Sequence, residues 1–84
     1  MIKTHEIKLT TSNFNQFNNN NYIIVEDKEH KIEINDYILF KQIEIRETQT
    51  EIDTGLFKMT QVKDIITNEG LKENYVLLSL VKFD

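Results

Sequence analysis

Cysteine, proline and tryptophan are absent from this chain of 84 residues, which contains only two glycines and two histidines. The lack of cysteine excludes a disulfide framework and thiol catalysis. Zinc sites of the usual Cys/His spacing are excluded as well. Because there is no proline, charged side chains must protect the strand edges from unwanted pairing. Because the chain has no cysteine and only two histidines, we expect neither a metal site nor a cofactor.

Long apolar runs are also missing. None approaches the roughly 20 residues that a membrane-spanning helix needs, and the opening MIKTHEIK lacks the apolar core of a signal peptide. We expect a cytoplasmic protein without membrane contact. A hydrophobic fraction of 39% and a charged fraction of 29% are typical of a soluble globular chain. The length predicts a single domain over residues 1–84.

An excess of basic residues is the third missing feature. Ten Lys and Arg stand against fourteen Asp and Glu, which gives a net charge of −4. Residues 43–84 hold eight of the acidic groups and five of the basic ones, so the second half is the more acidic. Proteins that follow a phosphate backbone normally present a basic face. The charge balance therefore disfavours generic nucleic-acid binding.

Alternation and capping residues predict the first elements. Residues 2–9 alternate in polarity, which indicates a half-buried opening strand. The segment TTSNFNQFNNNN, residues 10–21, then begins with Thr and Ser in cap positions, and Phe14 and Phe17 share a helical face, so we expect a helix near 11–18. The asparagines at 18–21 would end this helix, since Asn tolerates left-handed backbone geometry.

Further strands are expected at 22–26, 37–46, 56–67 and within 70–83. A charged loop at 26–31 and a turn at Asn35-Asp36 separate the first two of these. A long polar hairpin loop over 46–55 and a turn at 68–70 separate the others. Val62 departs from the alternation set by Phe57 and Met59, which suggests a bulge near Thr60–Gln61.

The closing strand is apolar on both alternating faces. Such a strand belongs at the centre of a sheet or in a barrel wall that is covered outside. We therefore predict an α+β, mainly β fold in which five to six strands and one or two short helices enclose one core. The two faces of the closing strand are formed by Tyr75, Leu77, Val81 and Phe83 and by Val76, Leu78 and Leu80.

An ordered set of short motifs runs through nearly the whole chain, and its most specific part is the closing segment. The motifs are His5-Glu6-Ile7-Lys8, Phe14, Ile34-Asn35-Asp36 followed by Tyr37 to Phe40, Thr54-Gly55, and Gly70-Leu71-Lys72-Glu73-Asn74-Tyr75-Val76-Leu77-Leu78-Ser79-Leu80. With these motifs the sequence resembles a small bacterial and phage branch of the ASCH domains, which have a PUA-like fold.

The resemblance implies a small pseudo-barrel with a cleft that is associated with RNA or modified nucleosides. It also identifies a departure. A Lys-x-x-Glu-x-Arg segment of the family aligns with Asn21, Ile24 and Glu26, so two charges are lost and one is reversed. A carboxylate at position 26 would repel phosphate. The Lys-x-x-Thr arrangement of related amidohydrolases is not found at the matching place, so we expect no enzymatic activity.

Five residues are the candidate nucleic-acid-binding site: His5, Lys8, Tyr22, Glu26 and Lys41. An imidazole or a tyrosine ring could stack on a base, and Lys8 could meet a phosphate. Each residue also has a structural interpretation. His5 could fix the strand end to a backbone carbonyl, Lys8 could be a solvated charge, and tyrosines in small β domains commonly lie at the edge of the core.

Two functions follow from these observations. The first is a non-catalytic module that binds RNA or a nucleotide weakly through a degenerate cleft, with only mild salt dependence. The alternative is an acidic protein-interaction or inhibitor module of phage or mobile-element type, with a basic protein partner. Its acidic hairpin would mimic the phosphates of a nucleic acid. Open strand edges leave monomer and dimer equally possible. The hairpin charges are Glu44, Arg46, Glu47, Glu51 and Asp53.

Overall fold

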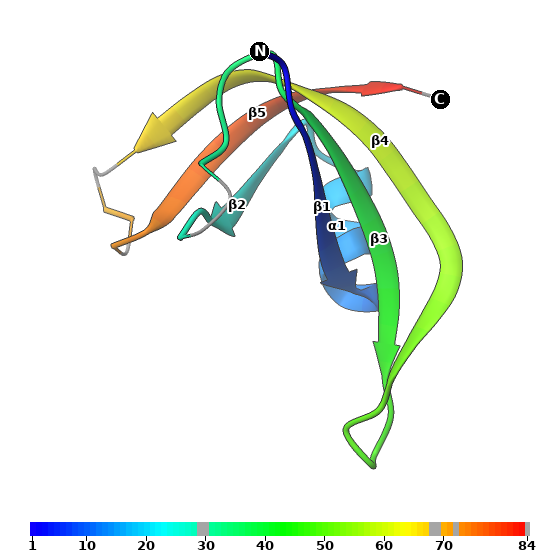
Figure 1. The fold of residues 1–84 in the computed structure, drawn as a ribbon. Helices are drawn as coiled ribbons and strands as arrows, with labels where there is room; N and C mark the ends of the chain where they lie inside the picture. Colours follow the sequence, from blue (N-terminus) through cyan, green and yellow to red (C-terminus); the bar gives the residue numbers. More distant parts are fainter. Residues whose placement is uncertain (29–30, 68–69, 72, 84) are drawn as a thin grey trace.

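The computed structural model describes residues 1–28, 31–67, 70–71 and 73–83 (Figure 1). Five strands and one helix follow in the order β1, α1, β2, β3, β4, β5. The helix, the only one in these residues, has eight residues and is too short to cross a bilayer. The elements are β1 (Thr4–Thr10), α1 (Thr11–Asn18), β2 (Tyr22–Glu26), β3 (Tyr37–Ile45), β4 (Glu51–Thr67) and β5 (Tyr75–Phe83).

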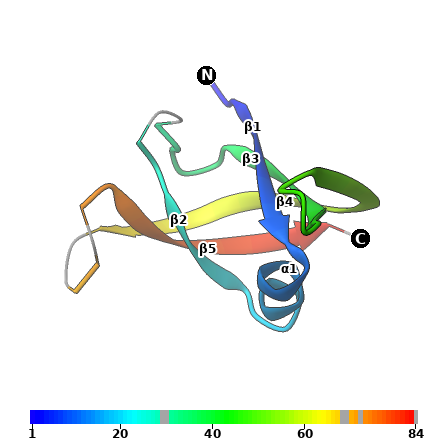
Figure 2. The same ribbon diagram turned by 90° about the horizontal axis from the view of Figure 1, so that it is seen from below.

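All five strands form one sheet in the order β1-β3-β4-β5-β2. β1 pairs with β3 in parallel, and the other three neighbouring pairs are antiparallel. The sheet curls into a half-barrel with α1 inside the curve (Figures 1 and 2). The expected mainly β architecture is therefore confirmed, with five strands and one short helix.

The core fills the concave face of the sheet. α1 turns Phe14 and Phe17 inward, and the Phe17 ring lies 4.6 Å from the Phe40 ring, measured between centroids. β1 contributes Leu9 from its inward face. The cluster of buried residues consists of Leu9, Phe14, Phe17, Val25, Ile32, Ile38, Phe40, Val62, Val76, Leu78 and Leu80.

The predicted helix and its two buried rings are confirmed, but both ends of the helix differ in detail. The N-cap is Thr10, which makes no side-chain cap hydrogen bond. At the other end Asn19 has right-handed backbone angles, φ −90° and ψ −2°, so no left-handed asparagine ends the helix there. Instead the Lys82 ammonium of β5 donates to the carbonyls of Phe17 (2.7 Å) and Asn18 (3.0 Å).

Strand β4 begins earlier than expected, because Glu51 already pairs with Ile45. The hairpin loop therefore covers 46–50 and not 46–55. The register with β3 shifts around Gly55, whose φ of 85° suits a glycine. The expected turn at 68–70 lies mostly outside the described residues; Gly70 within it has φ 89°.

The bulge expected near Thr60–Gln61 is wrong. The register with β5 shifts between Val62 and Asp64 instead. Thr60 is fully buried beside Val62 in the inward row, and its hydroxyl donates to the carbonyl of Ile38 at 2.9 Å. Val62 thus keeps the phase of the strand, and the alternation looked broken only because a polar side chain occupies an inward position.

β5 lies between β4 and β2, away from the sheet edges, as its two apolar faces predicted. Its inward residues Val76, Leu78 and Leu80 are buried. Its outward residues are only partly covered: Val81 is 43% exposed and Phe83 is 42% exposed. The cover expected outside the barrel wall is not provided by the described part of the chain, because α1 packs on β1 and β3 from within.

Candidate functional site

The structure places the five predicted site residues in three surroundings. His5 is buried on the inner side of β1. Lys8 and Glu26 line one concavity between β1 and β2, and Tyr22 lines an adjoining one. Lys41 lies on the outer side of β3 beside acidic side chains. Three of the five residues are thus brought together at one surface, whereas His5 and Lys41 do not line these concavities.

The concavity between β1 and β2, which we call the seam, has a volume of about 500 Å³. It lies where the curl of the sheet brings the two end strands of the half-barrel toward each other (Figure 2). The floor is apolar and the rim carries charges of both signs. The lining residues are Glu6, Ile7, Lys8 and Leu9 from β1, Ile24, Val25 and Glu26 from β2, and Tyr75 from β5.

The adjoining concavity, of about 300 Å³, lies between α1 and β2. Leu9 and Ile24 line both spaces, so the two form one continuous groove. Its polar groups are amides and a phenol from Asn13, Gln16, Asn20 and Tyr22. These groups can donate and accept hydrogen bonds but add no positive charge that would hold a phosphate.

The lysines near the groove are paired with acids. Lys8 Nζ lies 3.3 Å from Glu51 Oε2, and Lys41 Nζ lies 3.6 Å from Glu6 Oε1 and 3.9 Å from Asp53 Oδ2. These exposed pairs add little stability. They do neutralise the two cations predicted to meet a nucleic acid. The acidic hairpin therefore supplies partners to the neighbouring lysines, while Glu44 also lies 3.7 Å from Arg46.

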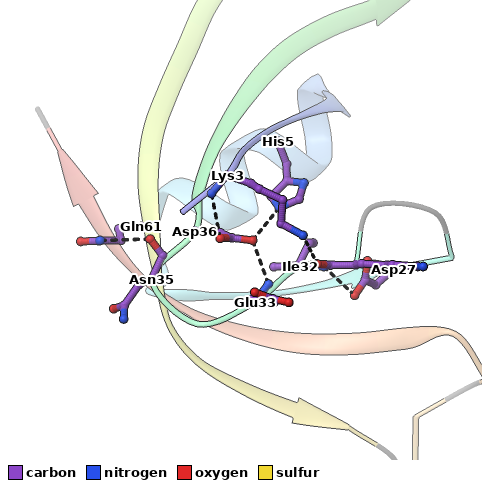
Figure 3. A network of polar contacts seen from close by, with 9 residues as sticks. Lys3, His5, Asp27, Ile32, Glu33, Asn35, Asp36 and Gln61 are labelled. Atoms are coloured by element: carbon purple, nitrogen blue, oxygen red, sulfur yellow. Dashed lines mark hydrogen bonds and ion pairs between the residues drawn. The ribbon is translucent and has the colours of Figure 1, made fainter. Parts of the chain in front are cut away.

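The side chain of Asp36 contacts the His5 ring near the start of β1 (Figure 3). His5 Nε2 lies 2.8 Å from Asp36 Oδ2, and both side chains are buried. Asp36 also accepts the backbone N–H groups of Lys3 and Glu33, each at 3.0 Å. His5 therefore fixes the strand end through the carboxylate of Asp36. The sequence indicated only a turn at Asp36, since a lone aspartate after asparagine gives no sign of a distant partner.

The loop before β3 is held by the same network. Asp27 accepts the backbone N–H of Ile32, and Asn35 takes the left-handed conformation with φ 78°. This agrees with the predicted turn at Asn35-Asp36. The Asn35 N–H donates to the Val62 carbonyl at 2.8 Å, so the turn is also attached to β4.

Opposing effects set the pKa of Asp36. Burial favours the neutral acid and would raise the pKa, but the hydrogen bonds from His5, Lys3 and Glu33 together outweigh it. The pKa of Asp36 is lowered to about 2. The carboxylate is therefore ionised at neutral pH and acts as a fixed acceptor that orients the His5 ring.

The outer surface of the sheet carries two groups of apolar residues, which we together call the outer face. On β4 and β5 the paired Asp64 and Ser79 lie between the two groups. Paired residues form two rows across neighbouring strands: Ile24–Leu77–Ile66 across β2, β5 and β4, and Leu39–Met59–Phe83 across β3, β4 and β5. Ile24 is 53% exposed. The outer face consists of these six residues with Tyr37, Phe57, Tyr75 and Val81.

Metal binding has no support from side-chain placement: within 1–28, 31–67, 70–71 and 73–83, no three His, Asp or Glu side chains gather closely enough to hold an ion. Comparison with protein-family models and with curated proteins gives no match for this chain.

Proposed function

We propose that this domain is a non-catalytic module that binds another protein through its outer face. The observation that carries the proposal is the pair of apolar rows on the side of the sheet opposite α1. Monomeric proteins rarely expose large contiguous apolar patches, and such patches commonly mark protein contacts. Aromatic residues and methionine, which are enriched at protein interfaces, contribute Tyr37, Met59, Tyr75 and Phe83.

The charge around the outer face suits a protein partner with a basic rim. Glu26 and Asp64 lie on exposed strand positions near the apolar rows, and the net charge of the chain is −4. Complementary charge at a rim accelerates association and orients the partner, while the apolar centre supplies most of the affinity. A cytoplasmic location belongs to the same proposal.

Binding of RNA or a nucleotide is the second candidate, and one observation favours it. Lys8, Tyr22 and Glu26, chosen from the sequence, line the continuous groove. The curled sheet and the short helix are also compatible with a degenerate member of the ASCH branch of the PUA-like fold, which we retain as a proposal. The geometry supports this candidate less, because Lys8 and Lys41 are paired with carboxylates and Glu26 adds a negative charge to the groove.

Site-specific photo-crosslinking distinguishes the two candidates. A photo-reactive phenylalanine analogue replaces Phe83 on the outer face, and as a control it replaces Thr48 in the exposed hairpin loop. In lysate of the source organism we expect a discrete protein adduct from position 83 that survives nuclease treatment, and none from position 48. Loss of the adduct on nuclease treatment would favour the nucleic-acid candidate. Equal labelling at both positions would reject the outer face as the binding surface.

A further inference from the structure

β1 and β2 are the two end strands of the sheet, and each has one edge that no other strand pairs with. An unpaired strand edge displays backbone N–H and C=O groups at the spacing of a β-ladder. In this half-barrel the two edges border the same seam, because β1 and β2 residues line one concavity. Among the described residues, the ladder pairings of β1 and β2 are with β3 and β5, respectively.

Backbone hydrogen bonds to the neighbouring strands identify the groups that face the seam. Just before β1, the carbonyl of Lys3 accepts the N–H of Tyr37 in β3. Since backbone groups alternate in direction along a strand, those of Thr4, Glu6 and Lys8 point away from β3. At the two ends of β2, the carbonyl of Asn21 accepts the N–H of Leu80 in β5, and the N–H of Asp27 donates to the carbonyl of Asn74 just before β5. The groups of Tyr22, Ile24 and Glu26 therefore point toward the seam.

Strand directions show what can close this seam. β5 runs parallel to β1, through two antiparallel steps from β3, and β2 runs antiparallel to β5. β1 and β2 are therefore antiparallel to each other. One additional strand between them would pair in parallel with one edge and antiparallel with the other. Each edge offers groups over a five-residue stretch, which spans roughly 17 Å of extended chain.

We propose that the seam binds an extended polypeptide segment of a partner protein, which adds a sixth strand between β1 and β2. Backbone hydrogen bonds to the Glu6 and Lys8 edge on one side and to the Ile24 edge on the other supply affinity, as in other cases of strand addition. A nucleic acid or a small anion cannot satisfy these alternating donors and acceptors along both edges. The seam shares Ile24 and Tyr75 with the outer face, but the proposal rests on the backbone edges of β1 and β2 and does not depend on the proposed function.

The lining of the seam specifies the side chains of the segment. Its inward positions contact Ile7, Leu9 and Val25, so they are apolar. Its outward positions lie beside Glu26, Glu6 and Lys8. Glu6 already lies 3.6 Å from Lys41, and Lys8 already lies 3.3 Å from Glu51. Opposite charges on neighbouring strands attract and like charges repel. The segment therefore alternates apolar residues with basic or neutral polar ones.

The test uses a defined pool of seven-residue peptides, acetylated and amidated, in which Val or Ile alternates with Lys or Thr. Binding to the full chain is followed by NMR of the backbone amides. We expect at least one peptide to bind and to shift and protect the amides of Glu6, Lys8, Ile24 and Glu26. The matched control is the same peptide with alternate backbone amides N-methylated, which removes donors and keeps the side chains. Each N-methyl group that faces an edge should weaken binding about tenfold.

A pair of protein variants makes the second test. Ile24→Pro removes an N–H that faces the seam and leaves the bonds of Ile23 and Val25 to β5 in place. Ile24→Thr shortens the apolar side chain but keeps the N–H. We expect the proline variant to bind the best peptide at least about tenfold more weakly than the threonine variant. The NMR spectrum of each variant reports whether its sheet is intact.

Three results would overturn the proposal. They are the absence of any binding peptide in the pool at millimolar concentration, equal binding of the N-methylated control, and protection of the same amides by dimerisation of the chain without peptide. The last result would assign the two edges to self-pairing. If Ile24→Pro fails to fold, the N-methylated peptides still decide the question, because they leave the protein unchanged.

Discussion

Asp36 connects segments that are far apart in the sequence. Its two carboxylate oxygens accept from His5 and Lys3 at the start of β1 and from Glu33 in the loop before β3. Its backbone carbonyl also accepts the N–H of Val62 in β4 at 2.8 Å. Hydrogen bonds to a charged acceptor are worth more than neutral ones, and removal of the acceptor leaves buried donors unsatisfied. Asp36 should therefore be the polar side chain with the largest effect on stability.

We predict that Asp36→Asn lowers the free energy of unfolding at pH 7 by about 2 kcal/mol, because one neutral amide oxygen cannot replace two charged acceptors. Urea denaturation followed by circular dichroism measures the change. Glu47→Gln, in the exposed hairpin loop, removes a charge of the same sign and should change stability by less than about 0.5 kcal/mol. Equal effects of the two substitutions would contradict the role given to Asp36.

The lowered pKa of Asp36 predicts how the free energy of unfolding falls at acid pH. The pKa of Asp36 in the fold, about 2, lies below its ordinary value of 3.8, so ionisation stabilises the folded state. This contribution amounts to about 1–2 kcal/mol once screening by nearby solvent is allowed for. It is complete above about pH 4 to 5. It is lost as the pH falls toward 2. The difference in stability between the wild type and Asp36→Asn should shrink over this range.

Single residues of the site were only partly predictable. The sequence identified His5 because it belongs to the opening motif His5-Glu6-Ile7-Lys8. It could not identify Asp36 as the partner, since 31 positions separate the two residues and only the parallel pairing of β1 with β3 brings them together. The curl of the sheet similarly brings Lys8 to the same groove as Tyr22 and Glu26, which the sequence alone could not show.

Helix α1 depends on β5 for its C-terminal end. Lys82 places its ammonium against the last carbonyls of α1 and 4.6 Å from the centre of the Phe17 ring. Burial, with a further contribution from Lys58, lowers the pKa of Lys82. A cation at a helix C-terminus satisfies carbonyls that have no partner in the helix and interacts favourably with the helix dipole. The last strand thus holds the first helix against the sheet.

We predict that Lys82→Met destabilises the protein by about 1 kcal/mol. Methionine keeps the apolar stem over Phe17 but cannot donate to the two carbonyls. Denaturation measures the loss, and faster amide exchange at the end of α1 should accompany it. Lys63→Met is the control, because Lys63 is an exposed lysine of β4 and should leave α1 unchanged. Unchanged exchange in α1 of the Lys82 variant would show that the helix end does not need this cation.

Local patterns predicted most elements and failed where polar residues take inward positions. The two phenylalanines of α1 and the short strand β2 follow from spacing alone. The start of β4 was missed because Glu51 to Gly55 contain a single apolar side chain, Ile52, yet their backbone pairs with β3. Buried Thr60 similarly concealed the true phase of β4. Hydrophobic periodicity reports side-chain burial, and these positions are defined by backbone pairing instead.

At the scale of the whole molecule, the sheet has apolar residues on both faces and a helix on only one. The outer face should therefore tolerate polar substitution as far as folding is concerned. Side chains such as Val81 and Phe83 remain more than two-fifths exposed. Replacing these side chains loses little buried apolar area. A charge placed in the inner row would be removed from solvent, which costs a large amount of free energy.

We predict that the double variant Val81→Lys, Phe83→Lys stays folded, with a free energy of unfolding within about 1 kcal/mol of the wild type. It should bind a fluorescent apolar dye more weakly, because a main part of the outer face is replaced. Ile38→Lys, at a fully buried inner position, should unfold the domain. Unfolding of the double variant would show that the outer face is packed and is not available to a partner.

The overall arrangement was predictable in class but not in connectivity. The number of strands and the single core follow from the runs of apolar residues. The strand order does not, because alternation carries no information about which edges pair. Parallel pairing of β1 with β3, and β2 at the far end of the sheet beside β5, leave the half-barrel open between strands that are neighbours in the sequence.

This strand order also has a kinetic consequence during synthesis. β2 leaves the ribosome before β5, but its only pairing partner in the described structure is β5, which is made about fifty residues later. Until β5 is made, β2 cannot pair with it, and chaperones that bind extended apolar stretches can reach the apolar face of β2. Pairings this distant in the chain fold slowly, so the nascent domain should acquire resistance to protease only after Phe83 has cleared the exit tunnel.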